Sequence, residues 1–126
     1  FARTVIDAGA DLVFGHGPHV PRAMDLYKGR FIAYSLGNFA TSTSVNITGV
    51  SGYAPMVKVV TDREGNFIEG EIISAIQQGQ DGARRPLLDS TRACVKEIKR
   101  LTEKDIPEAP IIIHNDGKIT LKGGGK

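Results

Sequence analysis

Two histidines near the start of the chain have a spacing that could serve metal binding. They occur in Gly15-His16-Gly17-Pro18-His19-Val20, directly after a short apolar run over residues 11–15. Neutral imidazole is a common ligand for zinc, manganese and iron. Because a glycine and a proline separate the histidines, we expect a turn that could aim both rings toward one point. A purely structural loop is the alternative interpretation, and the pattern alone does not exclude it.

Two histidines are too few for a catalytic metal centre, which normally has about three protein ligands, often with carboxylates. The nearest acidic residues, Asp7 and Asp11, flank the start of the apolar run, at the end opposite to His16. We therefore expect further ligands to come from outside this sequence. Residues 1–126 alone should bind metal weakly at most and should not be an active catalyst.

Ser35 and Asn38, in Ser35-Leu36-Gly37-Asn38-Phe39, are candidate substrate-binding residues. A predicted hairpin returns the chain toward the histidine loop, so both could line the same cleft. In the structural interpretation, Gly37 and Asn38 simply end a strand, since both residue types tolerate unusual backbone angles. Both interpretations stay open for Asn38, and the structural one is favoured for Ser35.

The remaining polar candidates favour structural interpretations. His114 precedes a turn and is predicted to be a surface histidine. Asp81, Arg84 and Arg85 belong to a polar stretch and could contact an anionic substrate, although a solvated loop is the favoured interpretation. Cys94 is the only cysteine, so it cannot form an intramolecular disulfide, and its amphipathic surroundings predict a buried structural thiol.

The elements that position the histidine loop can be predicted from local pattern. Ala2–Ala8 reads as a helix with Gly9 as its C-terminal cap, followed by a buried strand over Asp11–Gly15. We expect the partner strands of that strand to come from sequence before Phe1. Stretches 41–52 and 77–86 are predicted loops, and 123–126 is a flexible glycine-rich tail.

The rest of the sequence predicts antiparallel hairpins and one more helix. A helix should begin after Asp89 or Ser90 and run to about Lys104, with Cys94, Val95, Ile98 and Leu101 in one apolar stripe. The predicted hairpins are Ala23–Tyr27 with Phe31–Leu36 around residues 28–30, Pro55–Thr61 with Phe67–Ile76 around residues 62–66, and Ile111–Ile113 with Lys118–Leu121 around Asn115-Asp116-Gly117.

Composition limits the classes of function. With 40% apolar and 24% charged residues, the 126-residue chain has the balance of a globular domain. The formal net charge is +2 and no basic stripe is visible, so nucleic-acid binding is not expected. No apolar run approaches the ~20 residues that cross a bilayer. Because the chain begins with Phe1, the absence of a leader segment says little about location.

Three motifs in order and spacing resemble the CapA family of poly-γ-glutamate capsule synthesis proteins. They are Gly9-Ala10-Asp11-Leu12-Val13-Phe14-Gly15-His16-Gly17-Pro18-His19-Val20, then Tyr27-Lys28-Gly29-Arg30, then Tyr34-Ser35-Leu36-Gly37-Asn38-Phe39. The resemblance is dense over residues 9–39 and thinner beyond. It implies that residues 1–126 are the C-terminal half of one such domain.

The family in turn resembles calcineurin-like metallophosphoesterases. This implies an α/β fold: the C-terminal part of a four-layer α/β/β/α sandwich, with mostly antiparallel hairpins and two helices in this chain. In those enzymes a late Gly-His-x-His motif supplies ligands to two metal ions. His16 and His19 occupy the similar place with one extra intervening residue, and the resemblance implies catalytic and metal-binding roles for both. The family's earlier motifs, with Asp, Asn and His ligands, are absent from this sequence.

The resemblance leaves two functions open. In the first, the whole protein is a metal-dependent phosphoesterase-like hydrolase using Mn, Fe, Zn or Mg, bound mainly by the N-terminal half. In the second, it is a non-catalytic accessory or polymer-binding domain of a capsule assembly. The implied partners are capsule polymer or a phosphorylated substrate and other capsule synthesis proteins, with self-association of this segment. An extracytoplasmic or membrane-associated location in a bacterium is implied, although this chain does not determine it.

Overall fold

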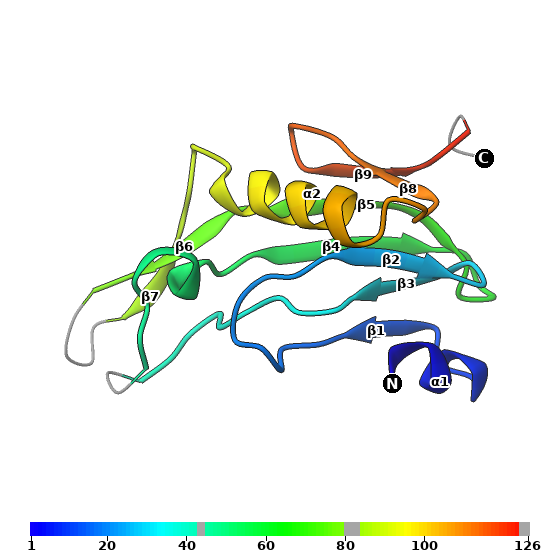
Figure 1. Cartoon of the computed structure of the whole chain (residues 1–126), viewed down its shortest axis with the longest axis horizontal. Helices are drawn as coiled ribbons and strands as arrows, with labels where there is room; N and C mark the ends of the chain where they lie inside the picture. The colour runs from blue at the N-terminus through cyan, green and yellow to red at the C-terminus, as the bar shows by residue number, and fades with distance from the viewer. Residues whose placement is uncertain (43–44, 80–83, 124–126) are drawn as a thin grey trace.

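The chain folds as a mixed α/β protein in which antiparallel strands predominate (Figure 1). The computed structural model describes residues 1–42, 45–79 and 84–123. The predicted class, mostly antiparallel β with two α-helices, is confirmed for this part of the chain. The elements, in chain order, are α1 (Ala2–Asp7), β1 (Leu12–Phe14), β2 (Met24–Tyr27), β3 (Arg30–Ala33), the 3-10 helix η1 (Gly49–Gly52), β4 (Met56–Thr61), β5 (Phe67–Ile73), β6 (Ala75–Gln78), β7 (Arg85–Leu88), α2 (Ala93–Asp105), β8 (Ile111–Ile113) and β9 (Lys118–Leu121).

A three-stranded sheet in the order β1-β3-β2 carries the histidine loop. The predicted β2–β3 hairpin is confirmed, with a turn one residue shorter than expected. Lys28 and Gly29 form this turn, both with positive φ (52° and 78°), as a tight two-residue hairpin requires. Arg30 already belongs to β3, which ends at Ala33 and not at Leu36.

The strand β1 differs from the prediction in two ways. It pairs in parallel with β3, so one partner strand comes from this chain and not from sequence before Phe1. It is also not buried, since Leu12 and Phe14 are 40% and 45% exposed. The reason is positional: among the described strands β1 forms the edge of its sheet, and only Val13 packs toward α1.

A second sheet, in the order β4-β5-β9-β8, contains the other two predicted hairpins. The β4–β5 and β8–β9 pairings are antiparallel, which confirms both hairpins. The burial of β5 does not alternate strictly, because the register shifts between Val60 and Thr61, and Phe67 and Ile72 are both buried in the same core. The predicted second strand of the β4–β5 hairpin is shorter than expected, because β5 ends at Ile73. The chain then enters β6, which pairs with a different neighbour.

The predicted loop over residues 77–86 is wrong in its described part. Gln77 and Gln78 belong to β6, and Arg85 and Pro86 belong to β7; these strands form a separate antiparallel pair. The sequence did not indicate this hairpin, because its polar residues and Pro86 are typical of a loop. Within the described residues β7 pairs only with β6, so it is an edge strand, where a proline is tolerated.

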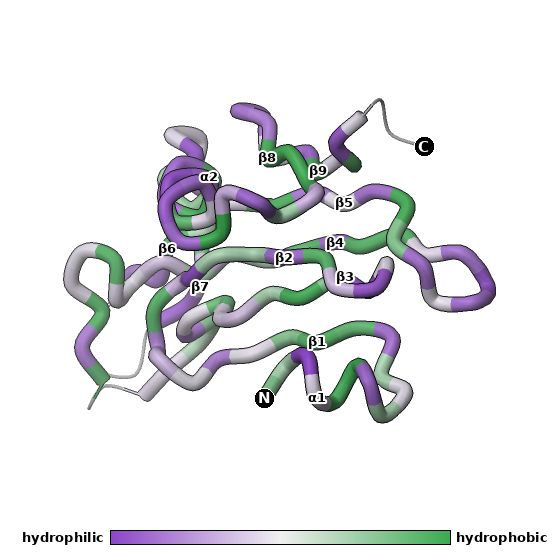
Figure 2. Tube along the Cα trace, turned by 45° about the vertical axis from the view of Figure 1, so that its right-hand side comes forward, coloured by the Kyte–Doolittle hydropathy of each residue, from purple (hydrophilic) through white to green (hydrophobic). Residues whose placement is uncertain are grey.

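The main core lies between the two sheets and beneath α2. Phe31 of β3 is fully buried and stacks on Phe67 of β5, with ring centroids 5.4 Å apart. The opposite face of the first sheet, at Ile32, is covered by α1 through Ala2 and Ile6. Both helices therefore pack on strands, and the hydrophobic side of α2 faces the sheets (Figure 2).

The helix α2 confirms the predicted apolar stripe, since Cys94, Val95, Ile98 and Leu101 are all buried. The helix begins at Ala93, later than expected, and its N-cap position is Arg92 in a left-handed conformation and not Asp89 or Ser90. Asp89 still satisfies the first helical N–H, since its Oδ2 accepts from Ala93 at 2.8 Å. The predicted buried thiol is also confirmed: burial raises the pKa of Cys94, whose Sγ lies 3.2 Å from the Ala75 carbonyl oxygen. In the described part of the chain, neither α-helix has the length and apolarity of a membrane span.

Candidate functional site

The histidine loop, residues 15–20, begins where β1 ends. Its first residue, Gly15, is held in place by backbone hydrogen bonds. The Gly15 N–H donates to the Ala33 carbonyl oxygen at 2.8 Å, and the Leu36 N–H donates to the Gly15 carbonyl oxygen at 2.8 Å. A Cβ on Gly15 would collide with the backbone carbonyl oxygen of Tyr34. Only glycine therefore lets the segment that follows β3 approach the start of this loop.

His16 is held by one hydrogen bond that defines its ring chemistry. Its Nδ1 lies 3.0 Å from the carbonyl oxygen of Gly37. Because a carbonyl can only accept, Nδ1 must carry the hydrogen, and the neutral ring then has its free lone pair on Nε2. Histidine ligands commonly have this arrangement, in which the second nitrogen donates to a backbone carbonyl. His16 is exposed, so Nε2 can accept a proton or bind a metal.

His19 closes the predicted turn. Its backbone N–H donates to the His16 carbonyl oxygen at 3.0 Å, and its own φ is 65°, which is uncommon for a residue other than glycine. Within the described residues the exposed ring makes no hydrogen bond. The turn between the histidines is confirmed, whereas convergence of the two rings on one ion stays a prediction.

Ser35 and Asn38 lie on either side of Gly37, which accepts the hydrogen bond from His16. Ser35 is fully buried and its Oγ accepts the Gly37 N–H at 3.2 Å, which supports its structural interpretation. Asn38 is half-buried, and its carbonyl oxygen accepts from Gln77 at 2.7 Å. Its side-chain amide makes no hydrogen bond to the described residues, so it could orient a ligand. The backbone neighbour of Asn38, Gly37, thus contacts His16, whereas a cleft shared by Asn38 and the histidines stays a prediction.

The backbone conformation of Gly37 and its close neighbours both disfavour any residue with a side chain. Its φ is 69°, and a Cβ there would lie 3.1 Å from the Tyr53 carbonyl oxygen and 3.2 Å from Pro21 Cδ. The Gly37 backbone therefore packs closely between the segment before β2 and the residue that follows η1. This packing holds the carbonyl that orients His16.

Gln77 is a site residue that sequence reasoning missed. It is only 3% exposed, and its amide contacts Asn38 and Thr41, residues 36 to 39 positions away in the chain. No local pattern could reveal a contact at that separation. The one indication in the sequence was that Gln77 follows Ala75 by two residues, so that both lie on the same face of a strand. The polar stretch that follows favoured a loop instead.

The predicted solvated loop around Arg84 is also corrected. Arg84 Nη1 donates to the carbonyl oxygens of Ser42 at 2.8 Å and of Val45, and the residue is half-buried. Arg84 therefore supports the segment that follows Asn38 and is not free in solvent. Arg85 is exposed in β7, as expected for a solvated residue. Asp81 lies outside the described residues.

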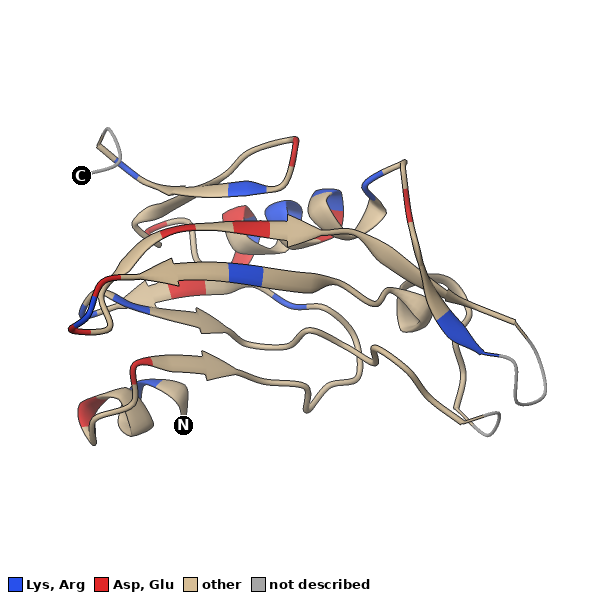
Figure 3. Cartoon of the chain, turned by 180° about the vertical axis from the view of Figure 1, so that it is seen from behind, with Lys and Arg blue, Asp and Glu red and all other residues tan. Residues whose placement is uncertain are grey.

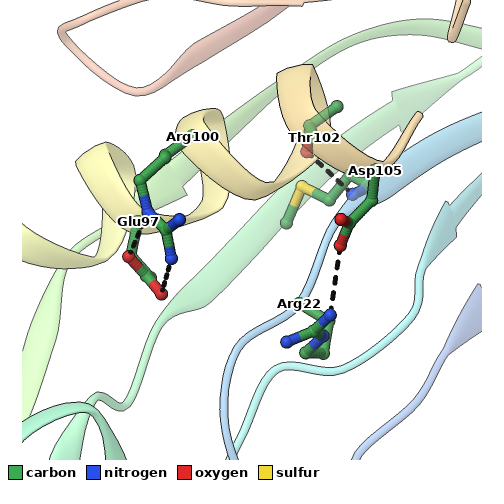
Figure 4. Close-up of polar contacts among 6 residues, drawn as sticks. Arg22, Glu97, Arg100, Thr102 and Asp105 are labelled. Carbon is green, nitrogen blue, oxygen red and sulfur yellow. Dashed lines mark hydrogen bonds and ion pairs between the residues drawn. The ribbon is translucent and has the colours of Figure 1, made fainter. Parts of the chain in front are cut away.

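A hollow of about 370 Å³ adjoins the histidine loop at Pro18. Arg22 and Asp105 lie on its wall and form an ion pair at 3.1 Å, which links the histidine loop to the end of α2 (Figure 4). Close by, the Met24 N–H donates to Thr102 Oγ1 at 3.0 Å. The end of α2 is thus fixed beside the site by one charged and one buried polar contact.

The acidic residues nearest in sequence are used elsewhere, as predicted. Asp7 pairs with Lys28 at 2.6 Å, and the hydrogen bond from Lys28 lowers the pKa of Asp7. Asp11 lies 3.7 Å from Arg30 at the start of β1, the end opposite to His16. His114 is exposed and bonds Thr120 Oγ1 at 2.8 Å, which confirms its surface position.

The donor atoms gathered at the loop are fewer than a metal ion requires. Within residues 1–42, 45–79 and 84–123, no three His, Cys, Asp or Glu side chains are grouped so that they could hold one ion. His16 fits a ligand role by its Nε2 lone pair, but it needs partners besides His19. A metal centre here would be completed by groups outside this described cluster.

Comparison with known proteins agrees with this arrangement of motifs. Residues 1–43 match the family described as bacterial capsule synthesis protein PGA_cap. The chain is 31% identical to the capsule biosynthesis protein CapA of Bacillus anthracis over 121 residues, which is 96% of this chain and 28% of that protein. Over 38 residues it is 55% identical to the PGA biosynthesis protein CapA of Bacillus subtilis and 47% identical to a probable polyglutamine synthesis accessory protein of Mycobacterium tuberculosis, in each case 30% of this chain and 10% of the relative.

The chain therefore belongs to the PGA_cap (CapA) family of capsule biosynthesis proteins. It spans little more than a quarter of the length of the Bacillus anthracis relative.

Proposed function

We propose that this chain is part of a poly-γ-glutamate-type capsule biosynthesis protein with a metal-dependent, phosphoesterase-like site that includes His16 and His19. The observation that carries the proposal is the hydrogen bond from His16 Nδ1 to the Gly37 carbonyl oxygen, which leaves Nε2 as the lone-pair nitrogen. A loop at the end of a parallel strand is also where α/β proteins place functional residues.

The roles of the residues follow from this geometry. His16 would bind a divalent ion through Nε2 or transfer a proton there, with its ring kept in one tautomer by Gly37. His19 would provide a second imidazole, and the free amide of Asn38 would donate to an anionic substrate. A bound metal would supply Lewis acidity toward a phosphoryl oxygen and lower the pKa of a bound water.

The choice of metal can be narrowed by the chemistry of the donors. Imidazole suits zinc, iron and manganese, whereas magnesium prefers oxygen ligands. Of the four candidate ions, Zn, Fe and Mn fit the histidines better than Mg. The carboxylates of a two-metal centre would come from the part of the family's length that this chain does not span, so residues 1–126 alone should be inactive.

The proposed fold is the C-terminal half of a four-layer α/β/β/α sandwich. Three successive layers support this: α1 covers the Ile32 face of the first sheet, and the Phe31 face packs on the second sheet through Phe67. The fourth layer is not supplied by α2, because α2 shares the core between the sheets. A fourth layer would cover the outer face of β4, where Met56 and Val60 are 37% and 40% exposed.

Partners and location follow from the family and are part of the proposal. The ligand would be capsule polymer or a phosphorylated substrate, and other capsule synthesis proteins would be partners. An extracytoplasmic or membrane-associated location in a bacterium would suit that role.

A non-catalytic accessory or polymer-binding role is the alternative proposal. It is favoured by the Mycobacterium tuberculosis relative, which is described as a probable polyglutamine synthesis accessory protein. In that role the same loop would bind polymer or a partner protein without turnover. The two proposals differ in whether phosphoesterase activity depends on a metal and on His16.

The test is metal-dependent phosphoesterase activity and metal content of the full-length protein, with His16→Ala as the variant. Loss of a ligand should reduce metal occupancy or activity at least about tenfold. His114→Ala is the matched control, because His114 is an exposed histidine far from the loop in sequence. Equal metal content in parent and His16→Ala by elemental analysis would refute the site assignment, and absent activity in a metal-loaded parent would favour the accessory role.

A further inference from the structure

We propose that Gln77 is a positioning residue of the histidine site, acting on His16 through the Gly37–Asn38 backbone. This inference rests on the proposed role of His16 and deepens it. Gln77 comes from β6, whereas the histidine loop follows β1, so the site would be assembled from two parts of the chain.

Both the oxygen and the nitrogen of the Gln77 amide make hydrogen bonds, and their partners lie in one short segment. Its Oε1 accepts from the Thr41 N–H at 3.1 Å and from Thr41 Oγ1 at 2.9 Å. Its Nε2 donates to the Asn38 carbonyl oxygen at 2.7 Å. The donor end and the acceptor end of one amide thus hold both ends of the segment from Asn38 to Thr41.

Two consecutive backbone carbonyls, those of Gly37 and Asn38, have different side-chain partners. The Gly37 oxygen accepts from His16, and the Asn38 oxygen accepts from Gln77. Rotation of the backbone between these carbonyls would break one bond or the other. Gln77 therefore fixes from one side the backbone that orients the His16 ring from the other.

Burial makes this arrangement specific. Gln77 is 3% exposed, and a buried amide that loses a partner retains its desolvation penalty. The strand that carries it is itself anchored, because the Ala54 N–H donates to the Ala75 carbonyl oxygen at 2.8 Å. The next residue, Gln78, is exposed on the same strand, and no contact with the site is found for it among the described residues.

The test uses variants that separate the two ends of the amide. At about pH 8.5 the carboxylate of Gln77→Glu can still accept from Thr41 but can no longer donate to Asn38. Gln77→Met removes both the donor and the acceptor and puts an apolar side chain of similar length in their place. It therefore serves as the test variant if the buried carboxylate of Gln77→Glu prevents folding. Gln78→Glu is the matched control.

The first readout is the tautomer of His16 in metal-free, [15N]histidine-labelled protein, measured from ring nitrogen shifts at about pH 8.5, where imidazole is neutral. We expect the parent and Gln78→Glu to be protonated at Nδ1. In Gln77→Glu and Gln77→Met the shifts should move toward a mixture of both tautomers. A folded Gln77 variant that keeps the parent tautomer would overturn the proposal.

The second readout is metal affinity of the full-length protein, measured by calorimetry with Mn²⁺ and with Zn²⁺. Loss of a group that orients a ligand should weaken binding about 10- to 100-fold. Unchanged affinity in Gln77→Met would contradict the positioning role while leaving the metal site intact. If the parent binds neither ion, the proposed function fails, and the tautomer measurement still decides whether Gln77 positions His16.

Discussion

The guanidinium of Arg3 on α1 lies 3.0 Å from Asp25 Oδ2 on β2, on the face of the first sheet that α1 covers. Asp25 is 1% exposed, and its carboxylate also accepts from the Leu26 N–H at 2.7 Å and from Tyr34 Oη at 3.3 Å. Burial, followed by the negative charge of Asp25, raises the pKa of Tyr34, so the phenol stays a donor at neutral pH. Arg3 is the cation that balances this buried acid.

Replacing Arg3 should therefore destabilise the protein more than replacing an arginine in a surface ion pair. We expect Arg3→Ala to lower the free energy of unfolding, since Asp25 would stay buried without its cationic partner. Arg100→Ala, which breaks the exposed Glu97–Arg100 pair on α2 (Figure 4), should lower it much less, because solvent screens that pair. Urea denaturation measures both, and equal effects would contradict the assigned role of Asp25.

Asp89 should make the stability of α2 depend on pH. Burial acts to raise the Asp89 pKa, but hydrogen bonds from Thr91, the Ala93 N–H and Ser74 outweigh it and lower the pKa below its ordinary value. With a folded pKa below the unfolded one, the stabilisation is fully present above about pH 4 and is lost as the pH falls through the folded value.

Asp89→Ala should lower the free energy of unfolding by about 1 kcal/mol at pH 7, the usual contribution of a helix cap. The difference between parent and variant should be smaller at a pH below the lowered folded-state pKa, where the carboxyl is protonated in both states. Glu108→Ala is the control, because Glu108 is exposed and makes no hydrogen bond within the described chain. Chemical denaturation at the two pH values decides this, and a pH-independent difference would exclude the capping carboxylate as its cause.

Residues 1–126 should self-associate in isolation. The outer edge of β1 has no strand partner among the described elements, and Leu12 and Phe14 are exposed there. Unpaired strand edges and apolar side chains favour pairing with another chain, at about 25 cal/mol per Å² of apolar surface buried. Sedimentation of the parent should show dimers or larger species. A stable monomer over the whole concentration range would show that this edge does not drive association.

Leu12→Lys should shift that equilibrium toward monomer, because a charged side chain on an edge strand opposes pairing. Val50→Lys is the matched control, since Val50 is similarly exposed (42% against 40%) but belongs to η1 and not to a strand. If both variants dissociate equally, the association does not use the β1 edge.

Duplex DNA should not bind appreciably at physiological salt. The formal net charge is only +2. A basic position on β4 lies beside acidic positions on β5, and α2 carries both signs, so the described part of the chain shows no continuous basic stripe (Figure 3). Phosphate contacts need clustered cations, and mixed charges largely cancel at a distance. A salt-sensitive submicromolar complex in a filter-binding assay would contradict this expectation.

The parts of the fold that the sequence predicted are those held together by neighbours in the chain. The stripe from Cys94 to Leu101 repeats with the period of a helix, and Asn115-Asp116-Gly117 joins two alternating strands. The β2–β3 hairpin was predicted for the same reason, because its turn residues adopt positive φ locally. Likewise, a glycine and a proline between the histidines were enough to predict the turn between His16 and His19.

What the sequence could not determine depends on contacts between distant residues. The His16 tautomer is set by a carbonyl 21 positions away, and Gln77 reaches Asn38 across 39 positions. The β6–β7 hairpin was missed because its polar residues look like a loop until Gln77 finds buried hydrogen-bond partners. The exposure of Leu12 and Phe14 likewise depends on which strands surround β1. Local propensity selects turns, helices and strands, whereas burial and polar pairing are properties of the packed structure, and these decided the orientation of His16 at the candidate site.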